Sequence, residues 1–253
     1  MNGNIVGTID GAELALYAFT LFFLILLFYL RREDRREGYP LEDELTGMVE
    51  TPGGPMHTAS TKTFRLPHGR GTVTAPTKGR EPADIAAKKF DPAGGSPYVP
   101  TGNPLADGIG PAAYAERDRL PDIDAHGRPR IVPMSSDGHM AVAARDTDPR
   151  GLPVYGADGK KAGTVSDLWV DRAEHVIRYL AVDTGTGTVL APMAMALVRR
   201  DHVSIDAINA SDFAGVPKLA AAAEITRYEE ERVVAYFGGG YLYANSGRQE
   251  PLL

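Results

Sequence analysis

The stretch "LALYAFTLFFLILLFYLRREDRRE", residues 14–37, joins an uncharged apolar run to seven consecutive charged residues. The apolar run, residues 14–30, contains 17 residues. As a helix it would rise about 26 Å, and the residues before it can extend it across a bilayer core of about 30 Å. Tyr17 and Tyr29 lie near its two ends, where interfacial aromatic residues are typical. The sequence therefore predicts one transmembrane helix over 12–32.

The charges beside this span predict its orientation. Arg31, Arg32, Arg35 and Arg36 follow the span, and no Lys or Arg precedes it. Because cytoplasmic flanks are enriched in basic residues, we expect residues 1–11 in the periplasm and the rest of the chain in the cytoplasm. The alternatives are a buried core helix or a cleaved signal, although the start "MNGNIVGTIDGAE" lacks the basic residues of a signal.

The composition narrows the classes of function. Hydrophobic residues make up 43% of the chain and charged residues 24%, as in folded proteins, while 28 Gly and 19 Pro predict much irregular backbone. A formal net charge of −6 argues against a nucleic-acid binder, for which a basic face is typical. The chain has no cysteine, so disulfides and thiolate chemistry are excluded.

Residues 33–142 are dense in Pro and Gly and contain only short extended pieces, such as "KTFRLP" (62–67) and "GTVTAP" (71–76). This segment has few apolar residues with which to form an interior of its own. We therefore expect an irregular cytoplasmic segment that lies on partner subunits, with a flexible linker as the alternative.

Residues 143–253 have the pattern of a mainly-β domain. Asp158-Gly159 predicts a hairpin turn between apolar runs, a second turn falls at 185–187, and "HVSIDAI" (202–208) alternates apolar with polar residues. Short strands at regular spacing suggest a small barrel or sandwich. The predicted fold class is thus a single N-terminal transmembrane helix plus a cytoplasmic mainly-β domain with one C-terminal helix.

The C-terminal helix is predicted from "TRYEEERVVAYFGGG", residues 226–240. Thr226 and Glu229 have the spacing of a capping box, and Gly238 is expected to end the helix. The apolar stripe between them is made up of Val233, Val234 and Phe237.

No catalytic motif is convincing. "LAVDTGTG" (180–187) resembles the sequence around an aspartic protease carboxylate, but that chemistry needs two such carboxylates and only one copy is present. Asp183 before a Gly-rich turn is also what a hairpin loop requires. Serine-hydrolase and nucleotide-binding motifs are missing, and the six histidines show no close pair for zinc. We therefore expect neither an enzyme nor a dedicated metal site.

"DIDAHGRPR", residues 122–130, is the more informative polar stretch. In an extended chain, alternate side chains would share one face, namely Asp122, Asp124, His126, Arg128 and Arg130. An imidazole exchanges protons near neutral pH, and neighbouring carboxylates can hold it ready to pass them on. The stretch therefore indicates a proton-exchanging surface. The alternative is a solvated polar loop with surface ion pairs.

A second group of titratable residues occurs in "WVDRAEHVIR", residues 169–178. Its members lie beside an apolar strand, and they are Asp171, Glu174, His175 and Arg178. We expect the same kind of chemistry from this group.

Five long strings of the chain, in order, resemble the H subunit of the purple-bacterial photosynthetic reaction centre: "YLRREDRREGYPLE", "KTFRLPHGRGTVTAP", "PTGNPLADGIGPAAYAER", "DPRGLPVYGADGKKAGTVSDLWVD" and "EEERVVAYFGGGYLYA". These strings are long and irregular, and together they span nearly the whole chain. The strand-rich part after residue 143 resembles the PRC-barrel domain.

The resemblance implies a structural and proton-conducting subunit of a light-driven electron-transfer complex in the bacterial inner, or chromatophore, membrane. Such a subunit would cap the cytoplasmic face of the L and M subunits, stabilise the quinone region and supply part of the proton route to the secondary quinone. It would bind no cofactor alone, since bacteriochlorophyll, bacteriopheophytin, quinones and non-haem iron belong to partner subunits. Membrane lipids and light-harvesting polypeptides would lie nearby.

The resemblance also implies roles for single residues. Asp124 and His126 match the family's proton-uptake pair at the surface. In some relatives a second histidine follows two residues later and the pair binds inhibitory zinc, but here Arg128 stands in that place, so strong zinc inhibition is not expected.

In the second group, Glu174 matches the family's buried acid near the secondary quinone, and Arg178 matches its basic partner. Asp171 would lie along the route. A carboxylate between charges can shift its pKa toward neutrality, as a proton relay requires. The alternative function is a membrane-anchored PRC-barrel interaction module of another assembly.

Overall fold

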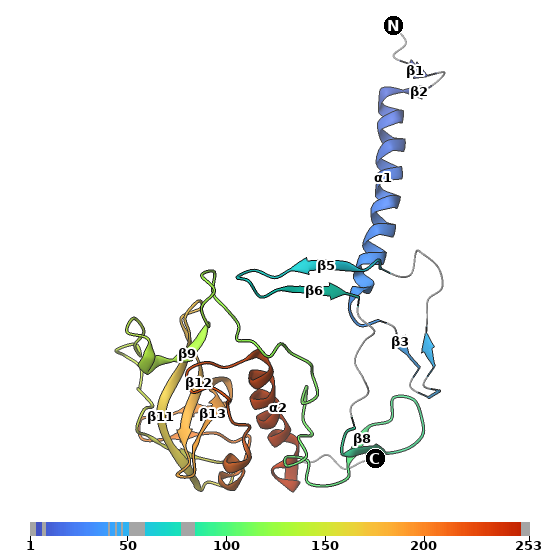
Figure 1. Ribbon diagram of the computed structural model, residues 1–253. Coiled ribbons are helices and arrows are strands. Elements are labelled where there is room, and N and C mark those ends of the chain that lie inside the picture. The colour runs from blue at the N-terminus through green and yellow to red at the C-terminus, as the bar shows by residue number, and fades with distance from the viewer. Residues whose placement is uncertain are drawn as a thin grey trace. The chain divides into compact units, whose positions relative to one another are not determined.

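The protein is described by a computed structural model (Figure 1) that covers residues 4–6, 9–39, 41–43, 45–46, 48–50, 59–76 and 84–248. The chain divides into two compact units. The first comprises Met1–Pro82 with Asp91–Ser96, and the second comprises Ala83–Phe90 with Pro97–Leu253.

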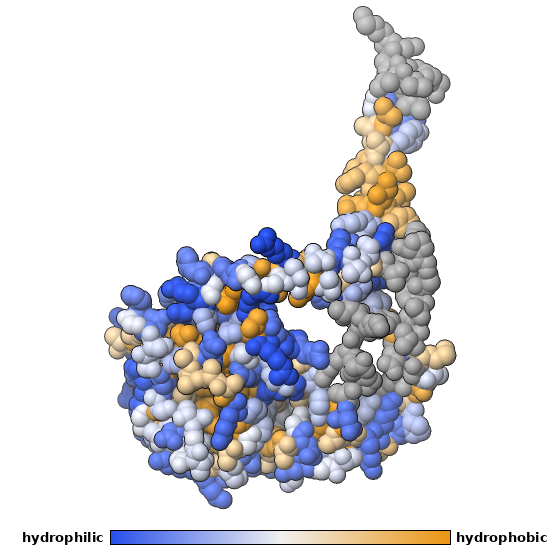
Figure 2. Space-filling view, in the orientation of Figure 1, coloured by the Kyte–Doolittle hydropathy of each residue, from blue (hydrophilic) through white to orange (hydrophobic). Residues whose placement is uncertain are grey.

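Helix α1 (Gly11–Glu33) organises the first unit. It begins where the side chain of Asp10 accepts a hydrogen bond from the backbone N–H of Glu13 at 2.8 Å, which satisfies one free donor of the first turn. None of its residues is buried, and its middle forms a continuous hydrophobic surface in Figure 2. At about 1.5 Å per residue the helix is about 34 Å long, enough to cross a bilayer. The predicted span is confirmed.

The other described elements of this unit are short. A 3₁₀ turn, η1 (Asp34–Arg36), follows α1 directly. Antiparallel pairs join β1 (Asn4–Val6) with β2 (Ile9–Asp10), β3 (Leu41–Glu42) with β4 (Val49–Glu50), and β5 (Lys62–Arg65) with β6 (Thr72–Ala75). The two extended pieces expected at 62–67 and 71–76 are therefore the two strands of one hairpin.

The second unit is built on a seven-stranded sheet in the order β13-β12-β11-β10-β15-β14, with β9 also paired to β11. Its strands are β9 (Ile131–Pro133), β10 (Pro153–Tyr155), β11 (Lys161–Asp171), β12 (Val176–Asp183), β13 (Thr188–Pro192), β14 (Leu197–Val198) and β15 (Val203–Ser204). The unit also contains the β7–β8 hairpin (Ala87–Lys89 and Tyr98–Pro100), helix α2 (Arg227–Tyr243), and the 3₁₀ turns η2 (Met134–Ser136), η3 (Met193–Met195), η4 (Ala210–Gly215) and η5 (Ser246–Arg248). The expected mainly-β domain with one C-terminal helix is confirmed.

Turn chemistry sets the connections between these strands. Gly159 and Gly185 have φ of 69° and 81°, the left-handed conformation that glycine adopts without strain, and they lie in the β10–β11 and β12–β13 turns as predicted. Strand β11 carries register shifts at Val165/Asp167 and Trp169/Val170. Such bulges bend a strand, and β11 pairs with β10 near its start and with β9 near its end. The sheet therefore curves around a core.

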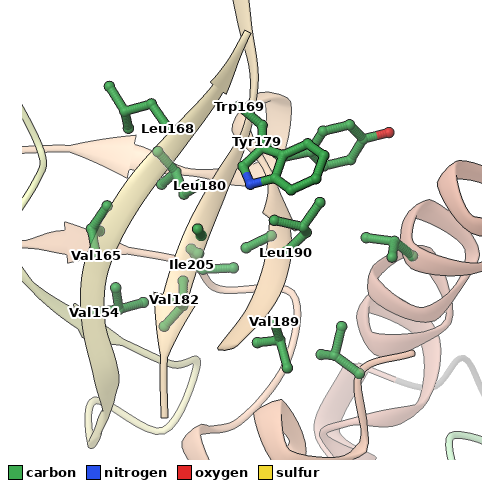
Figure 3. Close-up of a cluster of buried hydrophobic side chains, with 14 of the residues drawn as sticks. Val154, Val165, Leu168, Trp169, Tyr179, Leu180, Val182, Val189, Leu190 and Ile205 are labelled. Carbon is green, nitrogen blue, oxygen red and sulfur yellow. The ribbon is translucent and has the colours of Figure 1, made fainter. Parts of the chain in front are cut away.

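The core lies between the curved strands and continues beneath α2. Leu168, Leu180 and Ile205 have no exposed surface, and Figure 3 shows them gathered inside the sheet. On the opposite face of β12, Tyr179 points toward α2. Central residues of β11 and β12 are buried on both faces, which explains why their sequences are continuous apolar runs with little alternation.

Helix α2 confirms one part of its prediction and corrects two others. The capping box is present, since Thr226 and Glu229 exchange side-chain and backbone hydrogen bonds. Val233 and Phe237 are fully buried, but Val234 is 42% exposed and does not belong to the apolar stripe. The helix also does not end at Gly238, because it continues to Tyr243.

Two of the three glycines of α2, Gly239 and Gly240, are required by close packing. A Cβ on Gly240 would overlap the side chain of Ile208 and lie 2.5 Å from the carbonyl oxygen of Ala207. One on Gly239 would lie 2.9 Å from the carbonyl oxygen of Ile109. Tertiary packing thus outweighs the weak helix propensity of glycine, since only glycine lets the backbones approach this closely.

We expect Gly240→Ala to lower the free energy of unfolding by about 2 kcal/mol, because the added methyl group would overpack the contact with Ala207 and Ile208. Gly238→Ala is the matched control. Its Cβ would meet Pro111 at 3.6 Å, an ordinary contact, so it should be neutral or stabilise by about 0.5 kcal/mol through helix propensity. Denaturant unfolding of the two variants measures the difference; equal losses would contradict the assignment of Gly240 to close packing.

Candidate functional site

The stretch 122–130 folds back on itself, so the expected single extended face is wrong. The backbone N–H of Asp124 donates to the carbonyl of Arg128 at 2.8 Å, and that of Arg130 donates to the carbonyl of Asp122 at 2.9 Å. Gly127, with φ of 80°, makes the reversal possible. The five predicted residues are therefore divided between the tip and the base of a tight hairpin.

At the tip, the carboxylate of Asp124 organises the turn. It accepts hydrogen bonds from the backbone N–H groups of His126 at 2.8 Å and Arg128 at 2.9 Å, and from Nε of Arg128 at 2.9 Å. The backbone hydrogen bond from Arg128 is the main cause that lowers the pKa of Asp124 to about 2, while partial burial opposes it. Asp124 is therefore a fixed anion at neutral pH, with the exposed His126 next to it.

At the base, Arg130 joins the two groups that the sequence kept apart. Its Nη2 atom donates to Asp171 at 2.6 Å and to Glu174 at 2.9 Å, and its Nη1 atom donates to Asp122 at 3.2 Å. Asp122 also accepts a bond from Arg227 of α2 at 2.7 Å. One guanidinium thus binds three carboxylates, one from the 122–130 hairpin and two from the β11–β12 turn.

Asp171 is the buried member of this network, with 3% of its surface exposed. It ends β11 and holds the following turn, because its Oδ1 atom accepts the backbone N–H groups of Ala173 at 2.8 Å and Glu174 at 3.1 Å. Burial by itself would raise the pKa of Asp171. The hydrogen bonds from Arg130 and from the two amides outweigh it, so the pKa lies below its ordinary value.

Of the other members of the second group, Glu174 binds Arg130, whereas His175 and Arg178 are not among the hydrogen-bond partners of Arg130. The side chain of Glu174 is 57% exposed in this chain. Arg178 is exposed on β12. His175 has a φ of 57° and lines a separate apolar hollow with Met140 and Val142. The structure thus brings Asp171 and Glu174 together with the 122–130 hairpin, and it leaves His175 out.

Sequence reasoning missed Glu230 of α2. Tyr179 of β12, only 3% exposed, donates its hydroxyl to Glu230 at 3.0 Å. Burial raises the pKa of Glu230, which the Tyr179 bond and the charge of Arg178 only partly offset. Glu230, Val233 and Phe237 follow i, i+3, i+7 spacing, so helical periodicity could have placed this acid on the buried face.

The aspartic-protease-like motif is a hairpin loop, as its alternative interpretation predicted. Asp183 ends β12, and its carboxylate accepts the backbone N–H of Gly185 at 2.9 Å. The hydroxyl of Thr184 donates to the carbonyl of Gly187 at 2.8 Å. These bonds close the β12–β13 turn, so the residues of this motif have a structural role.

Fold and site together define a single-span membrane protein that carries a small curved-sheet domain and a network of charged residues at its surface. Residues 142–211 match the PRC-barrel domain, and residues 3–136 match the family described as the photosynthetic reaction centre, H-chain N-terminal region. The second match covers more than half of the chain.

The chain therefore belongs to the reaction-centre H-chain family. It is a structural subunit of an electron-transfer complex and associates with other subunits of the reaction centre. The predicted resemblance is confirmed. The H-chain match covers the span and both strands of the β5–β6 hairpin, which a PRC-barrel module of another assembly would not require.

We expect Arg130→Met to lower the free energy of unfolding by about 2 kcal/mol at neutral pH, because the buried Asp171 loses its counter-charge. The expected loss is not larger because the side chain of Arg130 is 23% exposed and solvent weakens its ion pairs. The pKa of Asp171 is lowered in the fold. The ionised Asp171 therefore stabilises the fold above about pH 4, which is the pKa of an Asp in an unfolded chain, and this stabilisation is lost as the pH falls. The deficit of the variant should therefore shrink in acid.

Arg128→Met is the control for this measurement, since Arg128 is 60% exposed and pairs with Asp124 at the open tip of the hairpin. Its loss should be much smaller than that of Arg130→Met in denaturant unfolding at neutral pH. If both variants lose the same stability, Arg130 does not organise the network.

Proposed function

We propose that this chain caps the cytoplasmic face of the L and M subunits, stabilises the quinone region and supplies part of the proton route to the secondary quinone. Reduction of a quinone to a quinol takes up two protons, and a site closed to bulk water must import them through titratable groups. The pigments, quinones and non-haem iron of the complex would be bound by the partner subunits.

The observation that carries this proposal is the bridge made by Arg130. It connects a solvent-exposed hairpin, which carries Asp124 and His126, with the turn that carries Asp171 and Glu174. The route would thus begin at an exposed imidazole and continue toward a carboxylate 57% exposed in the isolated chain, which a partner subunit could cover.

Within this route the groups have different roles. Asp124 and Asp171 have lowered pKa values and would serve as fixed anions that attract protons and orient their neighbours. His126 and Glu174 would exchange the protons, with Arg178 adjusting the local charge. Glu230, whose pKa burial raises, is a further carboxyl able to hold a proton near this network.

The orientation of the span supports a cytoplasmic site. Basic residues flank only the C-terminal end of α1, and they are Arg31, Arg32, Arg35 and Arg36. By the positive-inside rule the second unit would lie in the cytoplasm of a bacterium with this protein in its inner or chromatophore membrane. Protons for quinone reduction would come from the same side.

Glu174→Gln is expected to slow the proton-coupled second electron transfer to the secondary quinone while leaving primary charge separation unchanged, because an amide cannot carry the proton. Flash-induced absorbance changes of the complex measure both steps. Asp183→Asn is the matched control, since Asp183 is an exposed carboxylate at the opposite end of the β12 strand. An unchanged second transfer in Glu174→Gln would remove this residue from the route.

The double variant Asp124→Asn/His126→Ala should slow proton uptake after a flash, and small exogenous acids should restore the rate by delivering protons directly. A pH-indicator dye follows the uptake. His139→Ala serves as the control because His139 is another exposed histidine of the same unit. Normal uptake in the double variant would leave the hairpin as a solvated polar loop with surface ion pairs.

A further inference from the structure

The β5–β6 hairpin is fixed to the end of the membrane helix by a compact ion-pair cluster within the first unit. The carboxylate of Glu33, the last residue of α1, accepts bonds from Nε of Arg36 at 2.8 Å and from Nζ of Lys62 at 2.7 Å. Nη1 of Arg36 donates to the carbonyls of Ser60 at 2.6 Å and Ala75 at 2.8 Å. One guanidinium therefore holds both ends of the hairpin.

This cluster sets the depth of the hairpin relative to a bilayer. Helix α1 is only slightly longer than a hydrocarbon core, so its last turn lies at the level of the lipid headgroups. The first residue of the hairpin, Lys62, is hydrogen-bonded to Glu33 in that last turn. Figure 1 shows the hairpin running sideways from the base of α1. A strand pair at this level and in this direction runs along the membrane surface.

The register shows which face of the hairpin is turned to the bilayer. Nζ of Lys62 also donates to the hydroxyl of Tyr29 at 3.3 Å, and Tyr29 lies four residues, about 6 Å, back along the span from Glu33. Lys62, Phe64 and Val73 share one face, because side chains alternate along a strand and Phe64 pairs with Val73.

That face presents a half-exposed apolar pair, and the hairpin carries positive charge. Phe64 is 44% exposed and Val73 is 48% exposed. The opposite face carries threonines, among them Thr63 and Thr74. Residues 59–76 contain Lys62, Arg65 and Arg70 and no Asp or Glu.

We propose that the Phe64–Val73 face of this hairpin lies in the interfacial layer of the bilayer, among the anionic phospholipids of the leaflet in which α1 ends. Apolar side chains gain free energy by insertion between headgroups and acyl chains, and basic residues nearby are attracted to anionic headgroups. The hairpin then acts as a second membrane contact that fixes the direction in which the chain leaves its anchor. This inference is independent of the proton route.

The absence of cysteine from the chain allows a direct test. Single spin labels are introduced through Phe64→Cys and Val73→Cys, with Thr63→Cys and Thr74→Cys as matched controls on the other face. The labelled reaction-centre complex is reconstituted in vesicles of phosphatidylcholine with phosphatidylglycerol. The accessibility of each label to oxygen, which enters the bilayer, is compared with that to a water-soluble nickel chelate.

The ratio of oxygen to chelate accessibility should be several-fold higher at positions 64 and 73 than at 63 and 74. This contrast should decrease in vesicles of phosphatidylcholine alone. Equal ratios on the two faces would overturn the proposal, and labels at 64 and 73 that neither reagent reaches would assign this face to a protein partner. A contrast independent of phosphatidylglycerol would overturn the assignment to anionic lipid.

Discussion

The charge of Asp171 is the constraint on which the arrangement of the second unit depends. A carboxylate that is almost fully buried at the end of a core strand is costly unless counter-charges and donors surround it. Arg130 and two backbone amides meet that requirement. Because Arg130 also holds Asp122, and Asp122 binds Arg227 of α2, this one requirement positions the 122–130 hairpin, the β11–β12 turn and the start of α2 together.

The first unit solves a related problem with the same chemistry. The strands described in this unit are two to four residues long, and the β5–β6 hairpin is held by Glu33, Arg36 and Lys62 at the end of the span. In both units, charge-assisted hydrogen bonds to a neighbouring helix or strand hold segments that are rich in Pro and Gly in a defined conformation. An extended, irregular segment can thus be held in place without a hydrophobic interior for every part of it.

The sequence predicted elements better than it predicted contacts. The span, the turns at Gly159 and Gly185 and the capping box of Thr226 are local features, and each was confirmed. The predicted end of α2 at Gly238 was wrong, because Gly239 and Gly240 continue the helix where their backbone packs closely against Ile109 and Ala207. The extended geometry of 122–130 was wrong because Asp124 accepts its own neighbours' amides, which favours a turn over a strand.

By itself, the sequence determined the membrane anchor, the β domain, the family and the two titratable stretches, since hydrophobicity, turn residues and motifs are read along the chain. Only the tertiary structure decided that Arg130 joins those stretches, that the half-buried Glu230 accepts a hydrogen bond from Tyr179 and that Arg36 and Lys62 hold a hairpin to the span. These contacts link residues far apart in the chain. Which residues pair in these contacts is determined by the burial of charge and by close packing, and no local sequence pattern specifies either.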